Sequence, residues 1–289
     1  MGVVNVTPDS FSDGGLFHDV AAAVAYSHGL VEEGAAIVDV GGESTRPGSE
    51  GVSAEEELRR VEPVVERLRT ITVSIDTSKA AVAERAIALG AMMVNDVTAL
   101  RGDPDLAGVV ADSGAYLCLM HMLGEPRTMQ DDPRYDDVVS EVAAFLEERL
   151  SFAVEAGIEE ERICLDPGIG FGKTVEHNLE LVARLDEIVS IGRPVVVGAS
   201  RKRFLGRVLG DPDALTGPVA AGVAIAVLAF ERGASIFRAH DVREHVEALR
   251  ASPLRSPHRQ AARSIPAAPE RHGRGQRHAG LLLRRRALS

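Results

Sequence analysis

The sequence predicts an α/β protein whose residues 1–250 fold as a single domain, a (β/α)₈ (TIM) barrel. Short β-branched, apolar runs recur eight times along this stretch, and helical patterns separate them. The runs show no polar alternation, which is typical of parallel strands that are buried on both faces. Eight strand–helix pairs in this length fit a barrel better than a doubly wound open sheet, the alternative that the same alternation allows.

Each predicted strand is short and is followed by a segment with room for a helix. In chain order, the strands are expected at residues 1–6, 36–40, 71–76, 92–95, 116–121, 162–165, 194–199 and 235–238. Apolar residues at helical spacing mark the helices, as in the series Val138, Val142, Phe145 and Leu150. Glycines that favour a left-handed helix end precede several strands: Gly34, Gly90, Gly157, Gly192 and Gly233.

The composition is ordinary for a soluble globular protein, with 45% hydrophobic and 26% charged residues. Cys118 and Cys164 lie far apart in the sequence and form no CxxC pair, so we expect neither a disulfide framework nor a cysteine-rich metal site. This cysteine usage favours a reducing, cytoplasmic location. The longest apolar run, residues 219–230, is shorter than the roughly 20 residues of a membrane helix, and no cationic-then-apolar leader opens the sequence.

Charge divides the sequence into two regions. Residues 1–250 hold 23 Lys and Arg against 42 Asp and Glu, a net charge of −19, which disfavours binding to nucleic acid. Residues 251–289 hold nine Arg and one Glu, a net charge of +8. This tail lacks an apolar period, so we expect it to be disordered and without a role; an arm for anionic surfaces is the alternative.

Polar side chains follow all eight predicted strands, and the carboxyl ends of barrel strands meet at the mouth that carries active sites. The residues concerned are Asn5, Asp39, Asp76, Asn95, Asp96, His121, Asp166, Ser200, Arg201, Lys202, Arg238, His240 and Asp241. A carboxylate accepts paired N–H donors such as those of an amino-pyrimidinone ring, and an asparagine reads a mixed ring edge. The cations after the last two strands favour binding of an anion, and barrels of this fold often bind phosphate in this region.

Two features allow other interpretations. The aspartates at positions 39, 76, 96 and 166 could form a metal cluster, although histidines with metal-ligand spacing do not accompany them. The segment 168–172 fits neither a P-loop nor a GxGxxG fingerprint, because Pro167 and Lys173 stand where glycines are needed. We interpret it as a place where backbone approaches a flat ring, with Phe171 packing on that ring. Met120 and Met122 either line the ring or fill the core.

Several motifs in this sequence are long and unusual. They read NVTPDSFSDGG at 5–15, DVGGESTRPG at 39–48, SIDT at 74–77, NDV at 95–97, LMHM at 119–122, DPGIGFGK at 166–173, GASRK at 198–202 and RAHDV at 238–242. In this order, they resemble the motifs of the dihydropteroate synthases of folate biosynthesis. The resemblance implies a pterin-binding barrel enzyme, a transferase that joins 6-hydroxymethyl-7,8-dihydropterin pyrophosphate to p-aminobenzoate and yields 7,8-dihydropteroate and pyrophosphate.

The resemblance also implies roles for individual residues. The pterin ring is held by Asp76, Asn95, Asp166 and Lys202, with Met120 and Phe171 along the ring. Three of these are expected to act in catalysis: Asp76, Asp166 and Lys202. The pyrophosphate is gripped by Arg238 and His240, and Asn5 contributes to Mg²⁺ there. The p-aminobenzoate pocket is framed by Phe11, Thr45, Arg46, Pro47 and Ser200, and loops 7–17 and 42–52 are expected to close over the site.

An arylamine is already a neutral nucleophile, so this reaction needs no Ser–His–Asp triad. The demanding step is release of pyrophosphate from a methylene carbon, where Mg²⁺ and cationic side chains stabilise the leaving group. We therefore expect an SN1-like displacement, with loop closure excluding water. The resemblance further implies a homodimer with small-molecule substrates, no nucleic-acid or membrane partner, and competition by sulfonamides at the p-aminobenzoate pocket.

Two other functions fit parts of the pattern. A pterin-barrel methyltransferase acting on methyltetrahydrofolate shares the Asp and Asn residues that read the pterin, but it does not need the STRPG and SRK groups. A non-catalytic pterin-binding paralogue would keep the ring site and lack turnover. The presence of every polar strand-end group favours the synthase.

Overall fold

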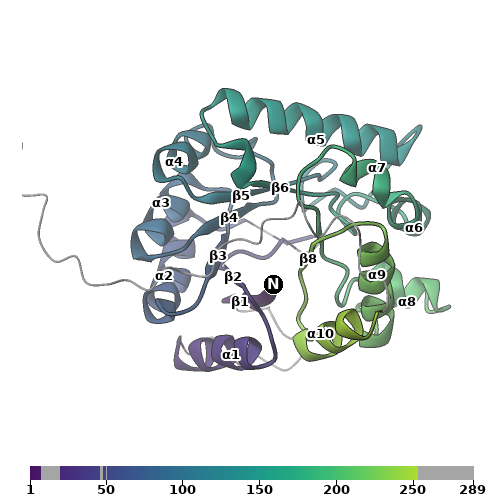
Figure 1. Ribbon diagram of the computed structural model, residues 1–289, viewed down its shortest axis with the longest axis horizontal. Coiled ribbons are helices and arrows are strands. Elements are labelled where there is room, and N and C mark those ends of the chain that lie inside the picture. The colour runs from purple at the N-terminus through teal and green to yellow at the C-terminus, as the bar shows by residue number, and fades with distance from the viewer. Residues whose placement is uncertain (8–19, 46–47, 50, 253–289) are drawn as a thin grey trace, which may run out of the picture.

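In the computed structural model, eight parallel strands form a closed barrel with helices around it (Figure 1). The structure describes residues 1–7, 20–45, 48–49 and 51–252. Six strands form one sheet in chain order: β1 (Gly2–Asn5), β2 (Val38–Gly41), β3 (Val73–Asp76), β4 (Met93–Asp96), β5 (Tyr116–Met120) and β6 (Ile163–Asp166). The other two, β7 (Val196–Val197) and β8 (Ile236–Phe237), pair with each other.

Two short backbone contacts close the barrel. Leu165 N donates to Pro194 O at 2.9 Å, which joins β6 to the segment that enters β7. Val3 N donates to Ala239 O at 3.1 Å, which joins β1 to the segment that leaves β8. Every strand therefore has two neighbours, and the (β/α)₈ barrel predicted from the sequence is confirmed.

Helices follow each strand and cover the outside of the barrel (Figure 1). They are α1 (Val20–Glu32), α2 (Ala54–Val65), α3 (Ala80–Leu89), α4 (Leu106–Ser113), α5 (Val138–Glu155), α6 (Val175–Ala183), α7 (Leu185–Val189), α8 (Arg203–Val208), α9 (Val219–Glu231) and α10 (Val242–Ala251). Their buried apolar side chains share one large core with the strands. The five glycines predicted to end helices have φ between 93° and 117°, a conformation that side chains disfavour.

The last two strands are shorter than predicted. Regular pairing covers residues 196–197 and 236–237, against predicted ranges of 194–199 and 235–238. The amides of Ser235 and Ile236 both donate to Val195 O, so the ladder is irregular where β8 begins. The residues that follow each short strand are then free to line the cavity described below.

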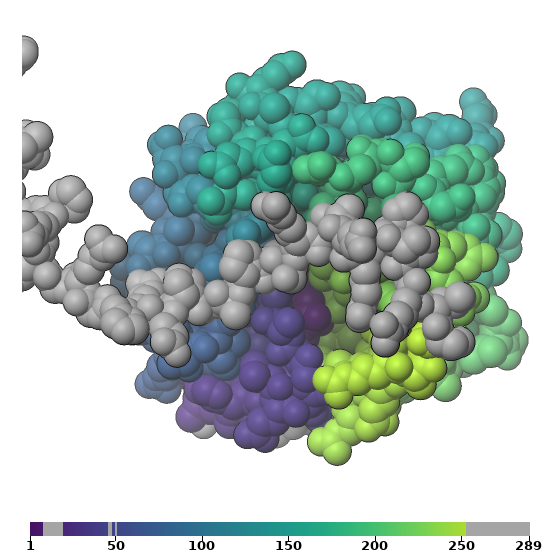
Figure 2. Space-filling view, viewed as in Figure 1, coloured from purple at the N-terminus to yellow at the C-terminus, as the bar shows by residue number. Residues whose placement is uncertain are grey.

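A second, smaller cluster of buried side chains joins five strand regions, as inward-facing positions of a barrel do: Ile37, Met93, Cys118, Cys164 and Val196. Cys118 and Cys164 stand opposite each other on β5 and β6, and both are free and buried. At the surface, the segment that carries α1 and the segment that carries α10 lie side by side (purple and yellow-green in Figure 2). Gly34, after α1, accordingly packs against Val246 of α10.

The described part of the chain contains no helix that combines the length and the apolar character needed to cross a bilayer. From residue 253 onward, the predicted tail lies outside the described residues. Its disorder therefore stays a prediction.

Candidate active site

A cavity lies at the carboxyl ends of the strands, at the mouth where the polar residues are predicted to meet. It is partly open to solvent. Its walls are formed by Thr45, Asp76, Asn95, Val97, Met120, Asp166, Ile169, Phe171, Gly198, Lys202 and Arg238. Eight of these are predicted site residues, whereas Val97, Ile169 and Gly198 are additions from the structure. The barrel thus brings together side chains that are far apart in the sequence.

Asn5 lies close to this cavity at the end of β1. A side chain added at Gly41 would lie 3.5 Å from Asn5 Oδ1 and 3.6 Å from Asp76 Oδ2, so both oxygens flank the same glycine. The absence of a side chain at Gly41 therefore keeps this corner of the mouth open. Three predicted residues lie outside the described residues, and their roles stay predictions: Phe11, Arg46 and Pro47.

Arg238, after β8, is held between carboxylates from two strands. Its Nε donates to Asp39 Oδ2 at 2.6 Å, and its Nη2 donates to Asp76 Oδ2 at 2.7 Å. Both carboxylates are buried. Burial raises the pKa of Asp76 to about 7, with Arg238 acting in the opposite direction and Asp39 adding to the rise. The guanidinium charge is thus shared by two acids at the cavity wall.

Asp39 is predicted from the sequence to lie at the mouth, and the structure adds its role as a counterion of Arg238. It is fully buried on β2, and its Oδ2 also accepts a hydrogen bond from Asn95 Nδ2 at 3.1 Å. Asp39 therefore orients both Asn95 and Arg238. The sequence carries one signal for this role, because a charged residue inside a buried strand needs a counterion.

The four-aspartate metal cluster considered from the sequence is not formed. Among the described residues, no three His, Cys, Asp or Glu side chains are placed to hold a metal ion together. Asp39 is the partner of Arg238, and Asp96 accepts the backbone amide of Leu100 at 2.6 Å. These two aspartates therefore act within the protein as a counterion and as a loop acceptor.

Asp166 ends β6 beside the glycine-rich segment 168–172. Its Oδ1 accepts the Gly168 amide at 2.7 Å. Burial raises the pKa of Asp166, and the Gly168 amide and Lys202 act in the opposite direction. Gly168 has φ of 68°, and a Cβ there would lie 1.8 Å from His121 O. Only glycine allows this close approach of two backbone segments, which brings the acidic strand end and the loop together.

Lys202 lies over the Phe171 ring, with Nζ 3.8 Å from the ring centroid. Burial, and secondarily Arg238, lower the pKa of Lys202 to about 7. Phe171 also belongs to a small buried cluster with Val97, Met120, Met122 and Met129. Met120 lines the cavity and packs in this cluster, whereas Met122 belongs to the cluster without being part of the cavity wall.

The two remaining predicted residues, Ser200 and His240, lie together near the last two strands. Ser200 Oγ and His240 Nδ1 are 3.2 Å apart. Burial lowers the pKa of His240 to about 3, and Arg238 and Arg201 contribute to this effect. His240 is therefore neutral at physiological pH. On the cavity wall, positive charge comes from Arg238, with Lys202 titrating near neutrality.

Lys173 is a buried lysine, and it lies behind the glycine-rich segment. Its Nζ donates to Phe171 O at 3.0 Å and lies 2.9 Å from His121 Nδ1. Burial lowers the pKa of Lys173 to about 7, and burial together with Lys173 lowers the pKa of His121 to about 2. Lys173 therefore supports the segment that carries Phe171.

This burial predicts how stability depends on pH. The pKa of Lys173 is about 7 in the folded protein against 10.5 for a free side chain, so between these values the unfolded chain binds more protons and stability rises with pH. Lys173→Met should lower that slope by up to about 1.4 kcal/mol per pH unit. Urea unfolding across this range measures the slope. The exposed-cation control Arg85→Met should keep the wild-type slope, and an unchanged slope in Lys173→Met would contradict the assignment.

The barrel, with acids and cations at its mouth, defines an enzyme that binds a polar ring beside an anion. Residues 1–240 match the family described as pterin binding enzyme. Over 255 residues, the chain is 46% identical to the dihydropteroate synthase of Escherichia coli strain K12. The match covers 86% of this chain and 89% of that protein. Over 257 residues, it is 47% identical to the dihydropteroate synthase of Mycobacterium leprae, covering 86% and 90%.

Solved structures agree. The Yersinia pestis dihydropteroate synthase in a sulfonamide drug complex has a TM-score of 0.82 and 44% identity, covering 86% of this chain and 90% of that one. The Xanthomonas albilineans enzyme in complex with 7,8-dihydropteroate has a TM-score of 0.76 and 46% identity, covering 88% and 94%. The chain belongs to the dihydropteroate synthase family, and the resemblance stated from its motifs is confirmed.

Proposed function

We propose that the cavity binds 6-hydroxymethyl-7,8-dihydropterin pyrophosphate and p-aminobenzoate, and that the chain condenses them to 7,8-dihydropteroate and pyrophosphate. The observation that carries this proposal is the convergence of Asp76, Asn95, Asp166, Lys202 and Arg238 on one cavity. These side chains supply the acceptors, donors and positive charge that suit a bicyclic nitrogen ring bearing a diphosphate. Membership of the dihydropteroate synthase family supports the same reaction.

In this proposal, the pterin ring lies against Asp166 and Asn95. Asp166 keeps one oxygen for the Gly168 amide and offers the other to ring N–H donors. Asn95 offers a further amide group at the ring edge, and Lys202 donates a hydrogen bond to the ring from the cavity wall. Met120 and Phe171 supply the apolar contact that a flat ring needs.

The diphosphate lies toward Arg238, His240 and Asn5. Mg²⁺ prefers hard oxygen ligands and is often held by one or two protein groups together with substrate phosphates. The Asn5 carbonyl oxygen at the barrel mouth, near the Asp76 carboxylate, fits such a site. When bound there, Mg²⁺ would neutralise part of the charge on the leaving diphosphate. Arg238 and His240 would donate hydrogen bonds to the same group.

We place the p-aminobenzoate beside Thr45, with Ser200 as a further contact. Thr45 lines the cavity, and Ser200 lies beside His240. The other members of this pocket come from the resemblance alone: Phe11, Arg46 and Pro47. A sulfonamide, which imitates p-aminobenzoate, would compete at the same place.

The displacement is SN1-like. The bond from the methylene carbon to the diphosphate oxygen breaks first, and both electrons leave with the diphosphate. The electron-rich dihydropterin shares the positive charge left on the methylene, and the carboxylates of Asp76 and Asp166 stabilise it by their negative potential. The arylamine nitrogen then forms the new bond to the methylene carbon and releases one proton to water. Arg238 stabilises the charge that develops on the leaving group.

We also propose that the protein acts as a homodimer in a reducing cytoplasm. Large exposed apolar side chains occur on α6, at the end of α8 and on α9: Leu179, Val208, Leu209 and Leu228. Apolar surface of this kind suits association between protein chains. A monomer mass in light scattering of the purified protein would contradict the dimer.

The reaction itself is tested by pyrophosphate release. Purified protein with Mg²⁺ and the pterin substrate should release pyrophosphate at a rate that depends on p-aminobenzoate. Comparing the full chain with a 1–250 version shows whether the tail contributes. No p-aminobenzoate-dependent release would contradict the proposal, and binding of the pterin substrate without turnover would indicate a non-catalytic paralogue.

A further inference from the structure

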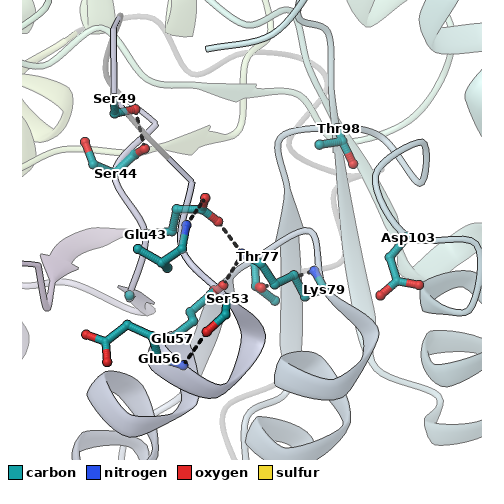
Figure 3. Close-up of polar contacts among 12 residues, drawn as sticks. Glu43, Ser44, Ser49, Ser53, Glu56, Glu57, Thr77, Lys79, Thr98 and Asp103 are labelled. Carbon is teal, nitrogen blue, oxygen red and sulfur yellow. Dashed lines mark hydrogen bonds and ion pairs between the residues drawn. The ribbon is translucent and has the colours of Figure 1, made fainter. Parts of the chain in front are cut away.

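The connection between β2 and α2, which carries Thr45 on the cavity wall, is tied together at its base by one carboxylate. Glu43 follows β2 by two residues, and its Oε1 accepts the amide of Val52 at 3.1 Å (Figure 3). Closer to the tip, Ser49 Oγ donates to Ser44 O at 2.6 Å. Glu43 thus joins the start of the connection to its end.

Lys79 fastens this carboxylate to the rest of the barrel (Figure 3). Its Nζ donates to Glu43 Oε2 and, at 2.6 Å, to Glu57 Oε2 in the first turn of α2. Lys79 itself lies just before α3, three residues after Asp76. One ammonium group therefore links the β2–α2 connection, helix α2 and the end of β3.

Glu43, Lys79 and Glu57 form a cluster that is more buried than a surface ion pair. The side chain of Glu57 is 0% exposed, and those of Lys79 and Glu43 are each 22% exposed. Burial raises the pKa of Glu57, while its hydrogen bond and charge interaction with Lys79 act in the opposite direction. The backbone packs just as closely, since a side chain at Gly42 would lie 2.9 Å from Glu57 Cγ. Buried charges of this kind cost solvation, and their best-attested use is to specify one geometry.

We propose that Glu43, held by Lys79 and Glu57, is a positioning residue that sets Thr45 on the p-aminobenzoate side of the cavity. This inference rests on the proposed function, which gives Thr45 to that substrate. Glu43 is two residues from Thr45 in the chain, and Glu43 and Lys79 are not part of the cavity wall. The residues proposed to bind the pterin lie on β3 to β6 and after β6 and β7, outside the β2–α2 connection. A change in this connection should therefore affect p-aminobenzoate more than the pterin.

The test compares Glu43→Ala with Glu62→Ala. The control removes Glu62, which pairs with Arg85 and so also joins α2 to α3, but with side chains 36% and 48% exposed and at a distance from the connection. Glu43→Ala leaves Lys79 to neutralise Glu57, so the variant is expected to fold. Because small displacements of binding groups have large kinetic effects, the KM for p-aminobenzoate should rise about tenfold or more. The Kd of the pterin substrate, measured by calorimetry without p-aminobenzoate, should stay within about twofold of wild type.

Glu43→Gln supplies the conservative comparison, because its amide oxygen can still accept the Val52 amide. The KM of Glu43→Gln for p-aminobenzoate should therefore lie closer to the wild-type value than that of Glu43→Ala. Equal changes in the two substrates, an unchanged KM in Glu43→Ala, or an equal rise in the Glu62→Ala control would each overturn the proposal.

Hydrogen exchange at the Val52 amide tests the positioning role without turnover. Exchange there should accelerate in Glu43→Ala and remain at the wild-type rate in Glu62→Ala. Wild-type protein that lacks p-aminobenzoate-dependent turnover would defeat the proposed function, and the exchange data would still decide whether Glu43 ties the connection. Unchanged exchange at Val52 in Glu43→Ala would defeat the positioning role even if the enzyme is active.

Discussion

Replacing Asp166 with alanine is expected to abolish binding of the pterin substrate. Asp166 is buried at the end of β6, and it lines the cavity with one oxygen committed to the Gly168 amide. In Asp166→Ala, the Gly168 amide loses its acceptor, and the pterin N–H donors lose the carboxylate oxygen that is proposed to accept them. A ligand donor that is buried without a partner loses its hydration and gains nothing in return.

The expected loss is about 4 kcal/mol or more, which is roughly a thousandfold in Kd. Calorimetric titration with the pterin substrate measures it. Asp166→Asn is the informative partner variant, because its oxygen can still accept the Gly168 amide while its NH₂ group faces the ring donors. It should fold like the wild type and still bind poorly.

The exposed aspartate Asp186 on α7 provides a matched control. Asp186→Ala removes the same group far from the cavity wall and should bind the pterin with wild-type affinity. Near-wild-type affinity in Asp166→Ala would refute the assignment of this residue to the ring.

Much of the site can be predicted from the sequence because parallel strands obey a simple geometric rule. Asp76, Asn95 and Asp166 each stand at or near the end of an apolar run, and parallel strands bring such ends to one mouth. The strand register brings two of them to the same level, because Asn95 pairs directly with Asp76. No knowledge of distant contacts is needed to group these residues.

Other parts of the site depend on contacts for which the sequence has no rule. Asp39 stands two residues deeper in the barrel than Gly41, which pairs with Asp76, and its partner Arg238 comes from the far end of the sequence, after β8. Lys173 follows a glycine-rich segment that suggests a phosphate loop, and only burial shows that it supports the segment from behind. Glu43 meets Lys79 through long side chains that many other arrangements would also allow.

Replacing Arg238 with methionine is expected to destabilise the protein as well as to stop turnover. Arg238 is the shared partner of Asp39 and Asp76, both of which are buried. Methionine fills similar space but leaves the two acids facing each other without a counterion. Breaking a buried ion pair in this way costs about 3–5 kcal/mol of unfolding free energy.

The loss should depend on pH in a direction that follows from Asp76. Its pKa is already raised to about 7 by burial, and Arg238 is the main group that lowers it, so Arg238→Met raises it further. A group whose folded pKa exceeds its unfolded value loses stabilising effect as pH rises through the folded pKa. The destabilisation should therefore be larger at pH above 7 than in mild acid. Urea unfolding at both pH values measures the difference, and an equal loss at both would contradict the coupling.

A second substitution separates stability from chemistry. Adding Asp39→Asn to Arg238→Met removes one of the two opposed charges, and the amide oxygen can still accept the hydrogen bond from Asn95. The double variant should recover part of the lost unfolding free energy, because the repulsion between Asp39 and Asp76 is gone. It should not recover pyrophosphate release, because the leaving group still lacks the guanidinium that is proposed to stabilise it. Recovery of turnover together with stability would show that Arg238 acts only as a counterion within the fold.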